Sequence, residues 1–121
     1  MRIEKEFHIN AAHYLPNYIG KCKQMHGHTW ILIVSCEGEP DPFTGMILDF
    51  RDLDAVVRRE VWSVLDHSVI NDTVKNPTAE NIAMWIVAKL DGKVPGPFTI
   101  RLSEGIDGSF VEKNTTGDGI C

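Results

Sequence analysis

The sequence lacks the features of several large classes of protein. No apolar run approaches the roughly 20 residues that a membrane-spanning helix needs, and we expect no signal peptide. Basic side chains are outnumbered, 12 against 17 acidic ones, which gives a formal net charge of −5. This balance argues against a nucleic-acid or anionic-membrane partner. Cysteine is scarce, with three widely spaced residues, so we expect a cytoplasmic protein without a disulfide framework.

What is present fits one globular domain. The chain has 121 residues, of which 43% are hydrophobic and 24% are charged, close to the averages for globular domains. We expect a single domain over residues 1–113. Residues 114–121 lack a hydrophobic pattern and are predicted to form a flexible tail.

Several segments have the patterns of strands. Residues 2–13 alternate between apolar and polar side chains, and residues 98–104 do the same. Residues 26–37 are rich in aromatic and β-branched side chains, which favour strands. Residues 109–113 can return as a hairpin strand, and residues 46–50 are interpreted as a short extended stretch.

Two further segments have helical patterns. Between Asp52 and Leu65, apolar residues recur at helical spacing. Thr78 can cap a second helix that ends near Leu90, and Glu80 in its first turn suits the helix dipole. The order strand–strand–helix–helix–strand–strand predicts an α+β fold in which two helices cover one face of an antiparallel sheet.

Three of the five histidines lie between positions 13 and 28. His26 and His28 are two positions apart in a predicted strand, so their rings point to the same side and can hold one metal ion. His13 ends the preceding strand on its apolar face and can approach the same point. Three imidazoles without a fourth protein ligand would form a catalytic zinc site, because one coordination position stays open. Taken alone, His13 is more typical of an ordinary polar residue at a strand end.

The other candidates for chemistry are a cysteine and an Asp–His pair. Cys22 lies four residues before His26 with a lysine on each side, an arrangement that favours its thiolate as a base or nucleophile. It could instead be a metal ligand; we favour the base. Asp66 and His67 could form a proton-transfer relay with it, although a polar turn that ends a helix explains them equally well.

Two more residues need individual interpretation. Glu104 extends the apolar face of a predicted strand, where a carboxylate is costly unless it is paired. It could accept two parallel N–H donors from a guanidine-like ligand edge, or the strand could end at Ser103 and leave it facing water. Cys36 is predicted to be a core residue, and Cys121 lies in the predicted tail.

Taken together, these residues resemble the 6-pyruvoyl-tetrahydropterin synthase / 6-carboxy-tetrahydropterin synthase family. The resemblance spans residues 7–105, in family order. Its most specific feature is the combination of two elements: a cysteine followed by HGH, within residues 22–28, and LDH at residues 65–67. The matching segments are FHINAAHYLP (7–16), CKQMHGH (22–28), DPFTGMILD (41–49), LDHSVIND (65–72), NPTAEN (76–81) and LSEG (102–105).

The resemblance implies a fold, an assembly and a metal. The fold is the tunnelling fold (T-fold), a four-stranded antiparallel sheet with two helices on one face, in the order β-β-α-α-β-β. Such subunits close into barrels, commonly homohexamers of two trimers with active sites between subunits. The implied cofactor is Zn²⁺, held by His13, His26 and His28.

The resemblance also implies roles for the remaining candidates. Cys22, Asp66 and His67 would form the proton-transfer set. Glu104 would anchor the ring of a small pterin substrate, and Thr78 is a further candidate for the pterin pocket.

The implied substrate is 7,8-dihydroneopterin triphosphate, and the family branches differ in product. One branch yields 6-carboxy-tetrahydropterin with acetaldehyde and triphosphate, towards queuosine and other deazapurines. Another eliminates triphosphate to a pyruvoyl product, and a folate-linked branch has glutamate in place of Cys22. The three residues between Cys22 and His26 favour the bacterial carboxy branch. A zinc- and pterin-binding domain without catalysis is the alternative from another class.

Overall fold

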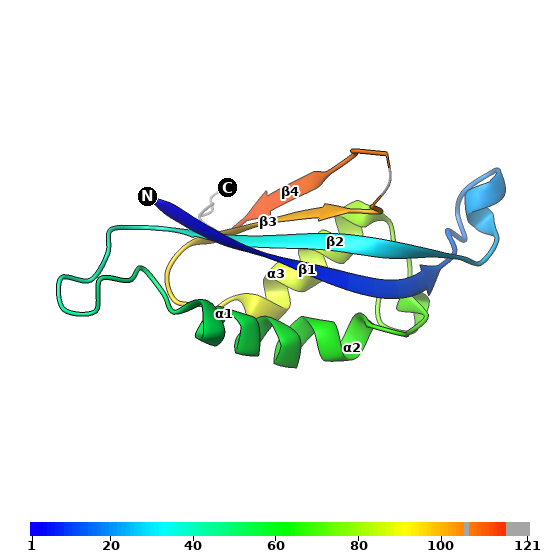
Figure 1. Ribbon diagram of the computed structural model, residues 1–121. Helices are drawn as coiled ribbons and strands as arrows, with labels where there is room; N and C mark the ends of the chain where they lie inside the picture. The colour runs from blue at the N-terminus through cyan, green and yellow to red at the C-terminus, as the bar shows by residue number, and fades with distance from the viewer. Residues whose placement is uncertain (106, 116–121) are drawn as a thin grey trace.

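Four antiparallel strands form one sheet in the order in which they occur in the chain (Figure 1). The computed structural model describes residues 1–105 and 107–115. The first two strands pair along their whole length, from Arg2 opposite Glu37 to His13 opposite His26. The strands are β1 (Arg2–His13), β2 (His26–Glu37), β3 (Phe98–Ser103) and β4 (Val111–Asn114).

The helices cover one face of this sheet, which confirms the predicted α+β arrangement (Figure 1). Three consecutive helical segments form one continuous rod. A second helix, later in the chain, packs against this rod. Within the rod, η2 is a stretch of π-helix. The rod consists of α1 (Phe50–Val57), η2 (Arg58–Trp62) and α2 (Ser63–Leu65); the second helix is α3 (Ala79–Leu90), and two short 3₁₀ helices are η1 (Lys21–Lys23) and η3 (Ile70–Asp72).

The caps of the two long helices follow from single side chains. Thr78 caps α3 as predicted, because its hydroxyl accepts a hydrogen bond from the backbone N–H of Asn81 at 3.1 Å. Asp49 caps α1 by accepting from the backbone N–H of Arg51 at 2.8 Å. The first helix therefore begins at Phe50, earlier than predicted. The extended stretch predicted for residues 46–50 is wrong, because no strand forms there.

The end of the described chain differs slightly from the sequence pattern. The last strand begins at Val111 rather than at residue 109, and it continues to Asn114. The backbone N–H of Thr115 then donates to the carbonyl of Phe98 at 3.0 Å. Most of the predicted tail, including Cys121, lies outside the described residues.

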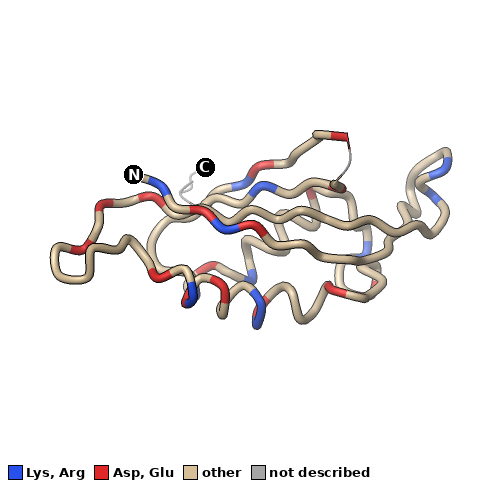
Figure 2. Tube along the Cα trace, in the orientation of Figure 1, with Lys and Arg blue, Asp and Glu red and all other residues tan. Residues whose placement is uncertain are grey.

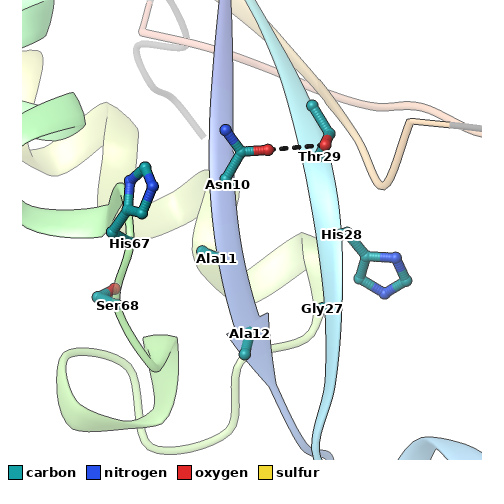
Figure 3. Close-up of a pocket in the computed structure, with 8 residues that line it drawn as sticks. All are labelled: Asn10, Ala11, Ala12, Gly27, His28, Thr29, His67 and Ser68. Atoms are coloured by element: carbon teal, nitrogen blue, oxygen red, sulfur yellow. Dashed lines mark hydrogen bonds between the residues drawn. The ribbon is translucent and has the colours of Figure 1, made fainter.

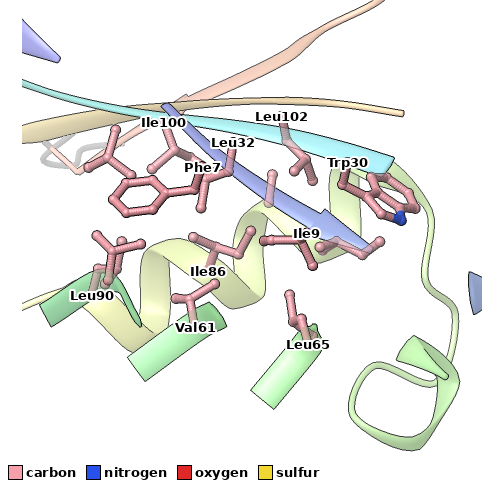
Figure 4. Packing of buried hydrophobic residues seen from close by; sticks show 14 of the residues in the cluster. Phe7, Ile9, Trp30, Leu32, Val61, Leu65, Ile86, Leu90, Ile100 and Leu102 are labelled. Atoms are coloured by element: carbon pink, nitrogen blue, oxygen red, sulfur yellow. The ribbon is translucent and has the colours of Figure 1, made fainter. Parts of the chain in front are cut away.

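The core fills the space between the sheet and the helices (Figure 4). Alternate residues of β1, β2 and β3 face the helices, as period-two side-chain alternation requires. Cys36 is buried in this core, as predicted. None of the described helices has the length and apolar character needed to cross a bilayer. The labelled core side chains come from both layers: Phe7, Ile9, Trp30, Leu32, Ile100 and Leu102 from the sheet, and Val61, Leu65, Ile86 and Leu90 from the helices.

We expect Ile86→Ala to lower the free energy of unfolding by about 2–5 kcal/mol, because it removes fully buried methyl and methylene groups and leaves a cavity. Met84→Ala is the matched control on the same helix. Its side chain is 52% exposed, so the change should stay within about 0.5 kcal/mol. Urea unfolding of both variants measures the difference, and equal losses would contradict this description of the core.

Candidate active site

The pairing of β1 with β2 brings three histidine rings together. His13 lies opposite His26, and Ala11 lies opposite His28. These histidines continue the rows of side chains that are buried further along each strand. Their ring centroids are 4.6 to 5.2 Å apart, and one ligand nitrogen from each lies within 4.8 Å of the others. The three rings therefore converge as the sequence pattern predicts.

Backbone carbonyls fix the orientation of two of these rings. Nδ1–H of His13 donates to the carbonyl of Pro77 at 2.8 Å, and Nδ1–H of His26 donates to the carbonyl of Gln24 at 2.7 Å. A carbonyl can only accept, so Nε2 is the nitrogen left with a free lone pair. Such carbonyl contacts are the usual support for a histidine that ligates a metal.

The cluster also leaves polar atoms without partners. The Nε2 atoms of His13 and His28 are buried and make no hydrogen bond with any described residue, which is rare for buried polar groups and is consistent with a bound ion. Trp30 packs edge-on against both rings, at 5.0 and 5.3 Å between centroids, and limits their movement. Three imidazole nitrogens form a donor set that suits zinc and similar divalent ions. The residues present therefore fit a divalent metal.

Burial favours the neutral form of the histidines in this cluster, and the neutral form can bind a cation. Desolvation lowers the pKa of His13 and of His28 below the ordinary value of 6.5, and the nearby carboxylate of Glu104 opposes the shift only in part. Both rings are therefore neutral at neutral pH, which is the form that binds a metal.

A cavity of about 490 Å³ adjoins the histidine cluster. Cys22, Thr78 and Glu104 all line it. Cys22 lies in η1, and the loop that contains this helix carries two lysines and no acidic residue (Figure 2). Thr78 lies where α3 begins, and Glu104 directly follows β3. The structure thus brings the predicted base and both predicted substrate residues to one cavity.

Glu104 reaches from this cavity to the histidines. Its Oε2 atom lies 3.6 Å from Nε2 of His13 and 3.7 Å from Nε2 of His28. The next residue makes this position possible: Gly105 has φ +109°, and a Cβ there would lie 2.4 Å from the carbonyl oxygen of Thr29 on β2. Any larger residue would push the chain away from β2.

Asp66 and His67 form a rigid pair in a different place. Nδ1–H of His67 donates to Oδ2 of Asp66 at 2.6 Å, and the backbone N–H of Asn10 donates to Oδ1 at 2.9 Å. Desolvation opposes the charge of Asp66, but the bonds from Asn10 and His67 outweigh it and hold the pKa of this carboxyl below its usual range. His67 has φ +58°, an unusual conformation for a residue other than glycine. Its imidazole is 79% exposed.

This pair does not meet Cys22 within one chain. The segment after α2 runs along the free edge of β1, where the N–H of His67 donates to the carbonyl of Asn10 and Ala12 bridges to Val69. Figure 3 shows His67 on one side of the β1–β2 pair and His28 on the other, with the two rings pointing apart. Cys22 instead lies in the cavity with Glu104. The three predicted proton-transfer residues are therefore divided between two places.

Sequence reasoning missed the residues that hold the site in place. Asn71 binds the backbone of Tyr14 twice, accepting from its N–H at 3.0 Å and donating to its carbonyl at 2.9 Å. This clamp fixes the chain directly after His13. Asn71 lies inside the LDHSVIND segment, but its contact spans 57 positions, which no local pattern can reveal.

Comparisons with known proteins identify the family of this chain. The family model for 6-pyruvoyl tetrahydropterin synthase matches residues 2–114. A Synechocystis relative named 6-carboxy-5,6,7,8-tetrahydropterin synthase is 39% identical over 109 residues, and the match covers 84% of each chain. A Pyrococcus furiosus relative named dihydroneopterin monophosphate aldolase is 38% identical over 93 residues, 77% of each chain.

A solved structure supports the fold independently of sequence. The 6-pyruvoyl tetrahydropterin synthase of Caenorhabditis elegans superposes with a TM-score of 0.81 over 95% of each chain, at 23% identity. The fold and the three-histidine site define a T-fold protein of the pterin synthase type. The chain belongs to the 6-pyruvoyl tetrahydropterin synthase family.

We expect the metal-free protein to lose stability as the pH falls below 6.5. His13 and His28 have lowered pKa values in the folded state, whereas in the unfolded chain they titrate near 6.5. Between these values the unfolded state binds more protons, so the free energy of unfolding rises with pH through this window and falls as the pH drops.

Urea unfolding with a chelator present, at several pH values between about 5 and 8, measures this dependence. A His13→Gln variant should show a shallower dependence because it removes one of the two groups. A slope that is the same in both proteins would contradict the role of the buried rings.

Proposed function

We propose that this protein is a zinc-dependent 6-carboxy-5,6,7,8-tetrahydropterin synthase. It converts 7,8-dihydroneopterin triphosphate and water to 6-carboxy-tetrahydropterin, acetaldehyde and triphosphate. The observation that carries the proposal is the convergence of three histidine nitrogens, from His13, His26 and His28, beside a cavity that contains Cys22 and Glu104. The Synechocystis relative's name supports the carboxy branch, and the free thiols of Cys22 and Cys36 are consistent with a cytoplasmic location.

The metal ligands in this proposal are the Nε2 atoms of His13, His26 and His28. A bound zinc ion supplies Lewis acidity, which makes the protons next to the hydroxyl groups of the substrate side chain easier to remove. The carbonyls of Pro77 and Gln24 hold two of the rings in the tautomer that presents Nε2.

The cavity residues orient the substrate and take its proton. The carboxylate of Glu104 accepts hydrogen bonds from a ring N–H and the exocyclic amine of the pterin, and Thr78 contributes to the same pocket. This anchoring holds the side chain of the substrate beside the histidines. Cys22, as a thiolate, takes a proton from that side chain.

Asp66 and His67 act in the active site of a neighbouring copy, within a homo-oligomer that we expect to be a hexamer. Two observations support this proposal. The ring of His67 is exposed and held by Asp66 at the outer edge of β1. Among the described residues, the cavity that His67 lines does not contain Cys22, which lies in the cavity with Glu104. Asp66 fixes Nδ1 as the protonated nitrogen, so Nε2 is the atom that carries the proton to and from the site.

Product identification tests the proposal. Zinc-loaded protein is incubated with 7,8-dihydroneopterin triphosphate, and products are identified by mass spectrometry. Release of acetaldehyde together with 6-carboxy-tetrahydropterin is the expected result. A pyruvoyl product would assign the protein to the pyruvoyl branch, and binding without consumption would make it a non-catalytic zinc- and pterin-binding domain.

A second candidate activity comes from the Pyrococcus furiosus relative, whose name describes an aldolase acting on dihydroneopterin monophosphate. The same assay with the monophosphate as substrate distinguishes it. Faster cleavage of the monophosphate than of the triphosphate would favour the aldolase and overturn the proposed function.

We expect Cys22→Ala to lower turnover by at least about 10²-fold while the protein still binds one zinc ion, because the residue acts as a base and not as a ligand. Cys36→Ala is the matched control; it lies in the core and should keep turnover. Steady-state kinetics and metal analysis of both variants test this. Loss of zinc from Cys22→Ala would show that Cys22 is a ligand.

A further inference from the structure

We propose that Glu104 has a second role: without substrate, its carboxylate completes the coordination of the metal held by the three histidines, and the pterin must draw it away. The inference rests on the proposed metal and pterin site. It adds a switch to that site, because one side chain serves the metal in the resting state and the substrate ring during binding.

The distances place the carboxylate where a fourth ligand would lie. Oε2 of Glu104 is almost equidistant from Nε2 of His13 and Nε2 of His28, at 3.6 and 3.7 Å. Two donors that share a tetrahedral zinc ion at about 2.0–2.1 Å are separated by about 3.4 Å. Both contacts are too long for hydrogen bonds. The spacing is that of ligands around an ion, not of groups bound to each other.

The charges of these atoms also favour a cation between them. Nε2 of His13 presents a lone pair, because Nδ1 carries the proton that is donated to Pro77. The carboxylate of Glu104 is likewise an acceptor. Among the described residues, its only ion-pair contacts are with His13 and His28, and no lysine or arginine neutralises it. Acceptors that face one another repel unless a positive ion lies between them.

The backbone holds Glu104 in this position. Ser103, at the end of β3, is buried, and its hydroxyl accepts from the N–H of Gly105 at 3.0 Å. Gly105 in turn lies so close to β2 that a Cβ would meet the carbonyl of Thr29. Glu104 is therefore fixed on both sides in the chain, and only its side chain can change its direction.

The metal and the pterin compete for the carboxylate of Glu104, so the binding of one affects the binding of the other. Glu104 also lines the cavity with Cys22 and Thr78, where the proposed pterin ring needs the same oxygens. A pterin that has no side-chain hydroxyl groups takes Glu104 from the metal and offers no oxygen in return. Thermodynamic linkage then requires that such a pterin weakens metal binding by the same factor by which the metal weakens pterin binding.

Zinc affinity, measured by chelator competition without any pterin, tests the ligand role. Glu104→Gln should bind zinc at least about tenfold more weakly than wild type, because even the loss of a partner beyond the direct ligands typically costs 10–100-fold. Glu39→Gln, a change of the same kind at a side chain that is 89% exposed, should keep wild-type affinity. Equal affinities of Glu104→Gln and wild type would overturn the proposal.

Two further readouts separate this role from folding and from the proposed function. In urea unfolding, metal-free Glu104→Gln should be at least as stable as metal-free wild type, which shows that weaker zinc binding is not a loss of structure. In cobalt-substituted wild type, unsubstituted pterin should change the visible absorption bands, whereas the Glu104→Gln spectrum should stay unchanged. Turnover of wild type reports on the proposed function alone, so either idea can fail without the other.

Discussion

The pairing register of β1 and β2 is the constraint on which the site depends. With His13 opposite His26, the buried rows of both strands end in imidazole rings that face one another. A shift by one residue would turn every side chain of β1 to the other face of the sheet. The same hydrophobic contacts that bury Phe7 and Trp30 therefore fix the position of the three histidine nitrogens that we propose as metal ligands. Stability and function share one set of contacts along these strands.

The fold places the candidate catalytic and binding residues on two sides of the three histidines. Glu104 reaches the histidines from β3, whereas His67 is held at the free edge of β1 by Asp66 and Asn10. In the proposed function, the carboxylate therefore serves the metal and the substrate of its own chain, whereas the exposed imidazole is directed outward. The homo-oligomer that we propose, in which copies share their sites, would account for both positions.

Local patterns predict much of this arrangement. Period-two alternation places His13, His26 and His28 on the core face, and the capping preference of threonine marks the start of α3 at Thr78. Patterns fail where a single side-chain contact, local or distant, decides the outcome. The local hydrogen bond from the N–H of Arg51 to the side chain of Asp49 begins the first helix earlier than its apolar spacing indicates. The clamp of Asn71 on Tyr14 joins segments 57 positions apart. The separation of His67 from Cys22 follows from the path of the chain along β1, which no motif specifies.

X-ray absorption at the zinc edge of the zinc-loaded wild-type protein tests the central claim most directly. The account predicts one zinc ion per chain, a first shell of nitrogen and oxygen at about 2.0–2.1 Å, and the multiple scattering of three imidazole rings. A sulfur atom at about 2.3 Å, or scattering from fewer than three rings, would contradict it.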